Sequence, residues 1–562
     1  MRANASSTLR LLLAVAASLL LLARSPIAVA KPASPPPASA APKKAHPAAD
    51  KKAAPKKPAG KPKGNAAAAP APASWHPPAP ASVDPPHPPP FNLAIDKATL
   101  GNGLRVVLNH DPGLPTVTIA VAYAAGPRNE AKDQEGFAQA AAQAMAHAPD
   151  AMPARDRLQQ MLDRGAVMKS VTTPDEVVFI ATLPAGALEF GLWVEAERMR
   201  RAQVTEAGLE QQRRSARDRD TAAITLAHLG AARARLEQSV FEGYWPYEHD
   251  ASSGPGNATL PQVQAFRQTY YAPNNAVVII TGEFEPDQAI KAVHRHFDDM
   301  PRNAQLPVFN PAPLPDQTNQ RSAVVRSEQT SSPLFVFGWP VPASRQPEHD
   351  ALAMTASILG EGEESRLAQK LAKAKLPVSF TVELDERRGP SLLLIAAQGS
   401  SDASLLAVRK IVDDEIDSIA RLGPSTDEMR RQWRTAESSF LRGLASAEQR
   451  AFRLSNLELL HGDARLIHAE LARVLAIGKD DIRKAAARFL SPTRRTLVEA
   501  NAAGRSLQPA ATPAPKPLAP APAAHTGPGY NPSAAPTAGK PGGKKKPATA
   551  KPDKPSGKKK KK

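Results

Sequence analysis

The stretch from Lys31 to Pro90 limits where this chain can fold, because it contains hardly an aliphatic side chain larger than alanine. Pro, Ala and Lys dominate it, and a segment of that composition cannot bury enough apolar surface to offset the entropy of ordering its backbone. The C-terminal residues from Arg505 to Lys562 are similar and end in five consecutive lysines. We therefore expect disordered tails at 31–90, with polyproline II character, and at 505–562.

Residues 1–30 indicate a secretory signal peptide. Two arginines precede an apolar run at Leu11–Leu22, and Ala28-Val29-Ala30 is a small-residue cleavage site. The apolar run is short for a membrane span, so an uncleaved anchor is the alternative. The chain has no Cys, which excludes a lipid-modified cysteine, disulfides and thiolate metal sites. We expect an exported, periplasmic or extracellular protein.

The net charge of +18 belongs to the tails. Residues 1–90 carry 12 Lys and Arg against 2 Asp, residues 505–562 carry 13 against 1, and residues 91–504 are left with a net charge of −4. Basic tails can bind nucleic acid through counterion release, but an exported protein meets little of it, so nucleic acid is not an expected partner. Anionic lipid or an envelope polymer is the expected contact, and a solvated tether without a specific partner is the alternative.

Within the core, Gly136 to His147 has the sequence GFAQAAAQAMAH, which is helical in composition and rich in Ala. It follows a β-like run at Thr116–Ala125 and a turn at Gly126-Pro127. Taken alone, this segment indicates only an Ala/Gln helix packed against a sheet, which needs no function.

Other segments carry a resemblance to a known family. The sequence LGNGLRVVL at 100–108 is followed later by YYAPNNA at 270–276, an apolar strand, Gly282-Glu283-Phe284 and a helix, and a second unit contains GEGEESRL at 360–367. In these features the chain resembles the M16 (pitrilysin/insulinase) metallopeptidases. The resemblance implies an α+β fold with two tandem domains: an N-terminal-type domain at 91–302, a linker at 303–320 and a C-terminal-type domain at 321–504.

The resemblance also locates a zinc site whose residues have changed. The family motif is Gly-[Leu/Phe]-Ala-His-x-x-Glu-His, and its first three positions match Gly136, Phe137 and Ala138. The first histidine, the general base, the second histidine and the family's third ligand fall on Gln139, Ala142, Gln143 and Arg219. A carboxamide is a poor zinc ligand, alanine cannot transfer a proton, and an arginine is a permanent cation. We therefore expect no cofactor, although the family cofactor is zinc.

Two further positions correspond to substrate-binding residues of the family. Residues 165–175 resemble the segment that leads to the substrate-pairing edge strand, with Lys169 in place of an Asn, and we predict a strand at Glu176–Leu183. Arg366 matches an Arg that holds substrate, although it is equally a structural residue at a helix start, and the Tyr that acts with that Arg falls on Val378.

The sequence gives little support to a metal site built from residues outside the family motif. His294 and His296 are two residues apart, so on a helix they point to different sides. The pairs Glu458 with His461 and His294 with Asp298 have helical spacing but supply two ligands at most.

The leading hypothesis is a non-catalytic M16 homologue that binds or encloses unfolded peptide beside an active M16 peptidase subunit, or as a homodimer. A stand-alone peptide-binding or scaffold protein tethered to the envelope by its basic tails is the alternative. A zinc endopeptidase with relocated ligands is the third, less favoured hypothesis.

Overall fold

The computed structural model describes residues 91–146, 154–201, 203–222, 226–248, 255–256, 258–326, 332–504 and 506–507, apart from the side chains of 154–158, 215–222 and 226–228. The expected signal peptide and the tail at 31–90 lie outside these residues, as does nearly all of 505–562. Among the helices in the described ranges, none has the length and apolar character needed to cross a membrane.

The first sheet has six strands in the order β1-β2-β6-β3-β5-β4. Their bounds are β1 (Asp96–Thr99), β2 (Arg105–His110), β3 (Thr116–Tyr123), β4 (Val167–Thr172), β5 (Val177–Pro184) and β6 (Ala276–Gly282). Only β2 and β6 pair in parallel. All residues of β6 and nearly all of β3 are buried, which requires cover on both faces of the sheet.

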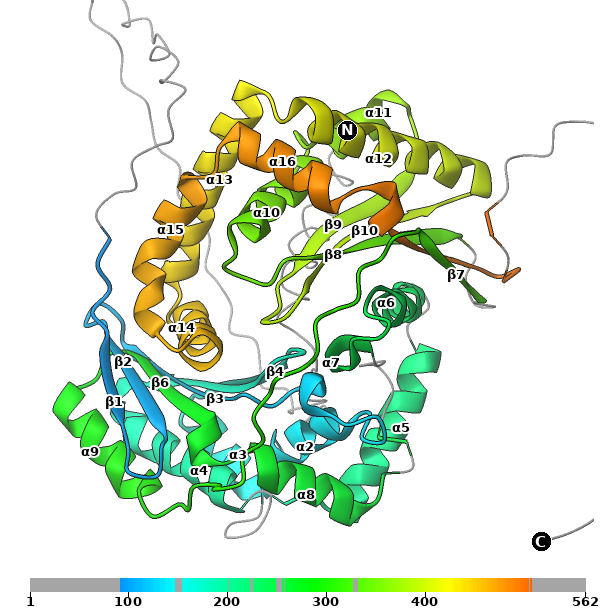
Figure 1. Ribbon diagram of the computed structural model, residues 1–562. Helices are drawn as coiled ribbons and strands as arrows, with labels where there is room; N and C mark the ends of the chain where they lie inside the picture. The colour runs from blue at the N-terminus through cyan, green and yellow to red at the C-terminus, as the bar shows by residue number, and fades with distance from the viewer. Residues whose placement is uncertain are drawn as a thin grey trace, which may run out of the picture. The chain divides into compact units, whose positions relative to one another are not determined.

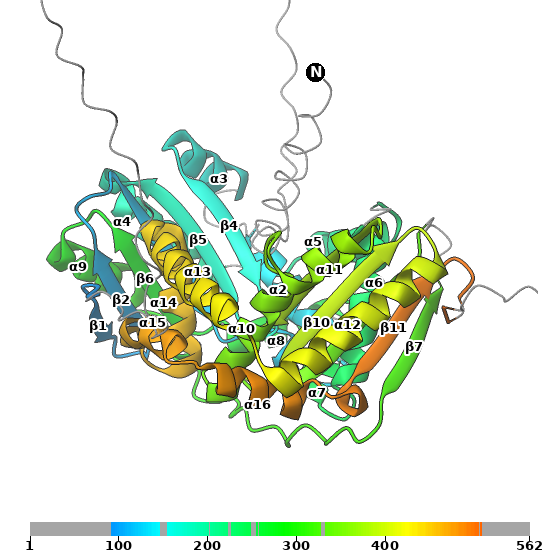
Figure 2. The ribbon, with the colours of Figure 1, turned by 90° about the horizontal axis from the view of Figure 1, so that it is seen from above.

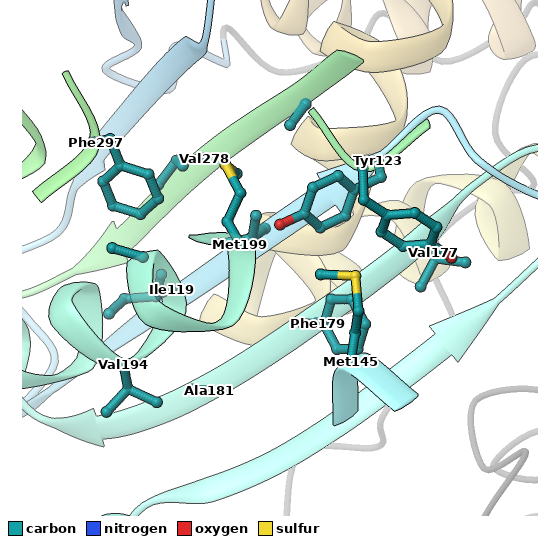
Figure 3. Close-up of a cluster of buried hydrophobic side chains, with 14 of the residues drawn as sticks. Ile119, Tyr123, Met145, Val177, Phe179, Ala181, Val194, Met199, Val278 and Phe297 are labelled. Atoms are coloured by element: carbon teal, nitrogen blue, oxygen red, sulfur yellow. The ribbon is translucent and has the colours of Figure 1, made fainter. Parts of the chain in front are cut away.

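One face of the first sheet is covered by helices from the same half of the chain (Figure 1). The helices of this half are α2 (Phe137–Ala146), α3 (Ala154–Asp163), α4 (Leu188–Arg201), α5 (Glu206–Ala222), α6 (Leu226–Val240), α7 (Trp245–Glu248), α8 (Leu260–Tyr270) and α9 (Pro286–Phe297). In the core beneath them, Met145 of α2 lies beside Phe179 of β5, and Phe297 of α9 belongs to the same cluster (Figure 3). This packing fixes α2 on the sheet.

The second sheet has five strands in the order β7-β11-β8-β10-β9. Their bounds are β7 (Arg321–Arg326), β8 (Leu334–Val341), β9 (Val378–Asp385), β10 (Ser391–Gly399) and β11 (Thr496–Asn501). The helices of this half are α10 (Pro347–Gly360), α11 (Arg366–Lys373), α12 (Asp402–Leu422), α13 (Thr426–Ala445), α14 (Ala447–His461), α15 (Ile467–Leu475) and α16 (Lys479–Phe489). Figure 2 shows β4 and β7 as edge strands of their respective sheets.

The two halves exchange a helix. Helix α14 of the second half packs on the remaining face of the first sheet, where Leu454 and Leu457 join a cluster with Ala120, Ile180 and Ile279. Helix α6 of the first half packs on the second sheet in the same way, through Leu236 and its neighbours. Gly338 allows this approach, because a Cβ there would come within 2.8 Å of the Leu236 side chain. Each sheet therefore completes its core only with the other half present.

Buried polar contacts hold the exchanged helices in register. Arg450 of α14 donates to Asn109 (3.1 Å) and Asp111 (2.7 Å) at the end of β2. Arg233 of α6 pairs with Glu383 (2.9 Å) and Asp385 (3.0 Å) of β9. These contacts have fixed geometry, so they specify which face of each helix meets the sheet.

Asp175, in the turn between β4 and β5, joins three elements. Its Oδ1 accepts hydrogen bonds from Arg128 Nη1 (2.8 Å) and the Tyr247 hydroxyl (2.7 Å), and its Oδ2 accepts from the backbone N–H of Arg388 (2.9 Å). The backbone N–H of Gly389 donates to the Tyr247 hydroxyl (3.0 Å). The turn between β9 and β10 is thereby attached to the first half.

Glu176, the next residue, is fully buried and meets α14. Its Oε1 accepts a hydrogen bond from Asn456 Nδ2 at 3.2 Å. Burial raises the pKa of Glu176 to about 8, so the carboxyl is largely protonated at neutral pH. Because the carboxyl of Glu176 is protonated, folding does not bury a negative charge where the first sheet meets α14.

The prediction of an α+β fold is confirmed, but the edge strand was placed one strand too late. The predicted strand at Glu176–Leu183 corresponds to β5, which lies inside the sheet, and the edge is β4, within the segment 165–175. Strand β5 carries the longer apolar run because it is buried on both faces.

We expect Asp175→Ala to lower the free energy of unfolding by about 3–5 kcal/mol, because Arg128 is only 3% exposed and would keep a buried charge without its partner. Urea denaturation measures this change. Asp414→Ala is the matched control, since Asp414 pairs with Lys410 on the exposed surface and its loss should change the stability far less. Equal effects of the two variants would contradict the assigned role of Asp175.

We expect the stability of the wild-type protein to fall with rising pH through Glu176. Its folded pKa of about 8 lies above the ordinary value of 4.5, so its contribution is complete below about pH 4.5 and is lost as the pH rises through 8. Between these values one such group lowers the free energy of unfolding by about 1.4 kcal/mol per pH unit.

Glu176→Gln removes the titrating proton and keeps the shape of the side chain. Urea denaturation of both proteins at several pH values should therefore give a shallower pH dependence for the variant. Parallel pH profiles would show that Glu176 is ionised in the folded state.

Candidate functional site

The N-terminus of α2 is held by a buried carboxylate that the sequence analysis did not single out. Glu130 Oε2 accepts a hydrogen bond from the backbone N–H of Gly136 (3.1 Å), and Oε1 accepts from that of Ala138 (2.7 Å). These N–H groups have no partner within the helix, so the side chain acts as a cap. Burial raises the pKa of Glu130 to about 8, against the opposing effect of these hydrogen bonds.

Helix α2 presents the altered motif with the spacing of a metal site. Gln139 and Gln143 are one turn apart on the half-exposed face of the helix, whereas Ala142 is buried at 3% exposure. Helix α5, which carries Arg219, packs against α2 (Figure 1). The Arg219 side chain lies outside the described part of the structure. Helix α2 therefore places residues 139 and 143 at the spacing of the motif, and the position of the Arg219 side chain relative to them stays a prediction.

The side chains on this scaffold do not fit a zinc ion. Two carboxamides and a methyl group supply neither the ligands nor the base that such a centre needs. Within the described residues, no three His, Cys, Asp or Glu side chains come together in a way that could hold a metal ion.

The histidines considered as relocated ligands are engaged elsewhere. His294 Nδ1 contacts Asp298 at 2.8 Å on the surface, and His296 turns to another side and lies 3.5 Å from Glu189. His461 Nε2 contacts the Ser344 hydroxyl at 3.2 Å, and burial together with the Arg345 guanidinium lowers the pKa of His461 to about 4.

Glu458 is not a partner of His461. It pairs with Lys97 at 2.7 Å and accepts a hydrogen bond from the backbone N–H of Ala464. The helical spacing of Glu458 and His461 therefore does not produce a ligand pair.

Lys169, one of the two proposed substrate-binding residues, lies on β4 and forms an ion pair with Glu448 of α14. Both side chains are about one-third exposed. Burial lowers the pKa of Lys169. The pair spans from the edge strand of the first sheet to the first turn of the exchanged helix.

Arg366, the other proposed substrate-binding residue, is the first residue of α11 and is occupied within the protein. Its Nε and Nη2 donate to the two carboxylate oxygens of Glu428 at 2.6 and 2.9 Å, and Nη1 contacts the Ser418 hydroxyl. Burial acts to raise the pKa of Glu428, but the hydrogen bonds from Arg366 and Ser425 and the positive charge of Arg366 together outweigh it, and the pKa falls to about 2. This geometry favours the structural alternative for Arg366 over substrate binding.

The side of β4 away from β5 has no strand partner within the described residues. Val167, at the start of β4, is 65% exposed, which is unusual for an aliphatic strand residue. An extended chain could pair with this edge through main-chain hydrogen bonds.

Two family models match the chain. The model described as insulinase (peptidase family M16) covers residues 105–242, and the model described as peptidase M16 inactive domain covers residues 257–435. The zinc protease PqqE of Helicobacter pylori is 22% identical over 415 residues, which are 72% of this chain and 92% of that protein.

Solved structures agree in fold. The crystal structure of a protease from Helicobacter pylori gives a TM-score of 0.69 at 21% identity and covers 73% of this chain and 100% of its own. The first half of the periplasmic protease PqqL from Escherichia coli gives a TM-score of 0.59 at 14% identity, with coverages of 74% and 93%. With both halves matched in order and the two-sheet architecture in common, this chain belongs to the M16 peptidase family.

Proposed function

We propose that this protein is a non-catalytic M16 homologue that binds an unfolded peptide beside an active zinc peptidase subunit. The observation that carries the proposal is the placement of Gln139 and Gln143 at ligand spacing on an intact, capped helix. A scaffold that keeps its fold without its metal chemistry can still supply a binding surface. The partner is an active M16 subunit or a second copy of this chain.

Peptide binding is supported by the edge strand β4. Among the described residues no strand pairs with its outer side, and Val167 is exposed and Lys169 about one-third exposed, so main-chain pairing and side-chain contacts are both available to an extended ligand. Binding through backbone groups depends little on peptide sequence, which suits a protein that encloses unfolded chains.

An exported location is part of the proposal. The signal-like residues 1–30 support it, and PqqL, which resembles this chain in fold, is described as periplasmic. The Lys-rich tails favour contact with anionic lipid or envelope polymer.

A stand-alone peptide-binding scaffold, tethered by those tails, is the second candidate. It differs from the first in one respect: the protein would purify from its own cells without an active M16 peptidase. A zinc endopeptidase with relocated ligands is the least supported, because the described residues contain no suitable ligand cluster.

The first experiment measures bound metal and cleavage of an unstructured peptide on the same sample of the full chain. We expect no stoichiometric zinc and no chelator-sensitive cleavage, because the amide side chains at 139 and 143 do not hold the ion. About one zinc per chain together with chelator-sensitive cleavage would overturn the proposal.

A restored variant serves as the positive control. It combines Gln139→His, Ala142→Glu, Gln143→His and Arg219→Glu, and should bind about one zinc per chain if the motif has been placed correctly.

The second experiment locates the peptide. Because the chain has no Cys, Val167→Cys introduces a unique thiol on β4 that can carry an environment-sensitive fluorophore. An unstructured peptide should change its emission, because strand pairing at β4 removes water from this position. The control is Val324→Cys on β7, the edge strand of the other sheet, where Val324 is 38% exposed. Equal responses at the two positions, or none at 167, would contradict docking at β4.

A further inference from the structure

An open hollow of about 700 Å³ lies at the junction of α13 and α14. It is lined by Ser439, Arg442, Gly443, Ala445, Ser446 and Gln449. On α13, Phe440 and Leu444 pack on the apolar cluster beneath α14, and Ser439 and Arg442 lie on the opposite side of the helix at helical spacing, while Ser446 links α13 to α14. The hollow is therefore on a face that the core does not use.

The first turn of α14 contributes to the hollow and also contacts β4, the edge strand of the first sheet. Glu448, which forms the ion pair with Lys169 of β4, stands between Ser446 and Gln449 in the first turn of α14. In the pairing of β4 with β5, Lys169 is opposite Ile180 and Val171 is opposite Val178, and both partners belong to the cluster that α14 covers. Side chains at 167, 169 and 171 therefore share the face of the sheet that carries α14.

A strand added to β4 would place every second side chain on that same face. Those side chains would extend beside the Lys169–Glu448 pair, toward the first turn of α14 and the hollow. Every second side chain of an added peptide would therefore face the hollow.

The two basic side chains in this region, Lys169 and Arg442, differ in their partners. Lys169 has a carboxylate partner, Glu448. Arg442 is exposed and donates to the hydroxyls of Ser438 and Ser439, and no carboxylate of the described residues lies within ion-pair distance of it. A guanidinium whose hydrogen bonds go to two hydroxyl groups keeps its positive charge available to a ligand, and a carboxylate is the group that the planar guanidinium binds best.

We propose that this hollow is a subsite for a carboxylate of a peptide paired with β4, and that Arg442 determines the specificity for it. The inference rests on the proposed function, because it requires a peptide at β4, and it names the ligand class: extended peptides with an acidic side chain or a free C-terminal carboxylate. Arg442 holds the carboxylate and takes part in no chemical step.

The test compares labelled unstructured peptides binding to the full chain by fluorescence anisotropy. One pair is amidated at the C-terminus and differs only by Glu against Gln at internal positions. A second pair contains Gln throughout and differs by a free or an amidated C-terminus. Each is measured with wild type, with Arg442→Gln and with Arg434→Gln, an exposed arginine about two turns earlier on α13 that serves as the matched control.

We expect wild type to bind one of the carboxylate-bearing peptides about tenfold more tightly than its neutral counterpart. Arg442→Gln should abolish this preference and leave the neutral peptide unaffected, while Arg434→Gln should keep the preference. The pair that shows the preference identifies the carboxylate as a side chain or a chain end.

Two results would count against the inference in different ways. Measurable binding without any preference, or a preference that survives Arg442→Gln, overturns the subsite and leaves peptide binding at β4 intact. No binding of any peptide overturns the proposed function, and the subsite with it.

Discussion

The fold depends on the exchange of two helices between its halves. Helix α14 covers the Val, Ile and Ala face of the first sheet, and α6 covers the equivalent face of the second. Without the partner half, each sheet would expose a continuous apolar surface, and each buried Leu or Ile contributes about 1.5–3 kcal/mol. The two halves are therefore successive in sequence but not independent in stability, and the relation of β4 to α14 is set by the packing that completes the cores.

Buried polar groups then fix how the exchanged elements meet. Apolar packing alone tolerates rotation of a helix on a sheet, whereas Asp175 accepts three hydrogen bonds of fixed geometry from Arg128, Tyr247 and the backbone of Arg388. Glu176 reaches the same junction in a largely protonated form. The turn that follows β4 is thereby tied to both halves, so the edge strand is held in a defined position, and no other strand of the described ranges pairs with its outer side.

Helix α2 is held in place by a cap at its N-terminus and by apolar packing on the sheet. Glu130 caps α2 through two backbone N–H groups, and Ala138, Ala142 and Met145 pack in the core. These buried residues and the half-exposed Gln139 and Gln143 occupy different faces of one helix. Sequence can change on the second face at little cost in stability, and the remaining surface supports peptide binding rather than cleavage as the proposed function.

The sequence alone predicted the α+β class, the strands that became β3 and β5 and the helix that became α2, because apolar runs and composition reflect burial locally. The resemblance assigned residues 139, 142 and 143 on that helix to the zinc motif. The sequence analysis missed β1, α5, α6 and α8, and it took β5 for the edge, because the short edge strand β4 has a half-exposed pattern and a weaker signal. Only the tertiary structure decided that Arg366 is paired with Glu428, that Lys169 meets Glu448 and that each sheet is covered by a helix of the other half. Such contacts join residues tens to hundreds of positions apart, and their partners follow from packing geometry that no local pattern encodes.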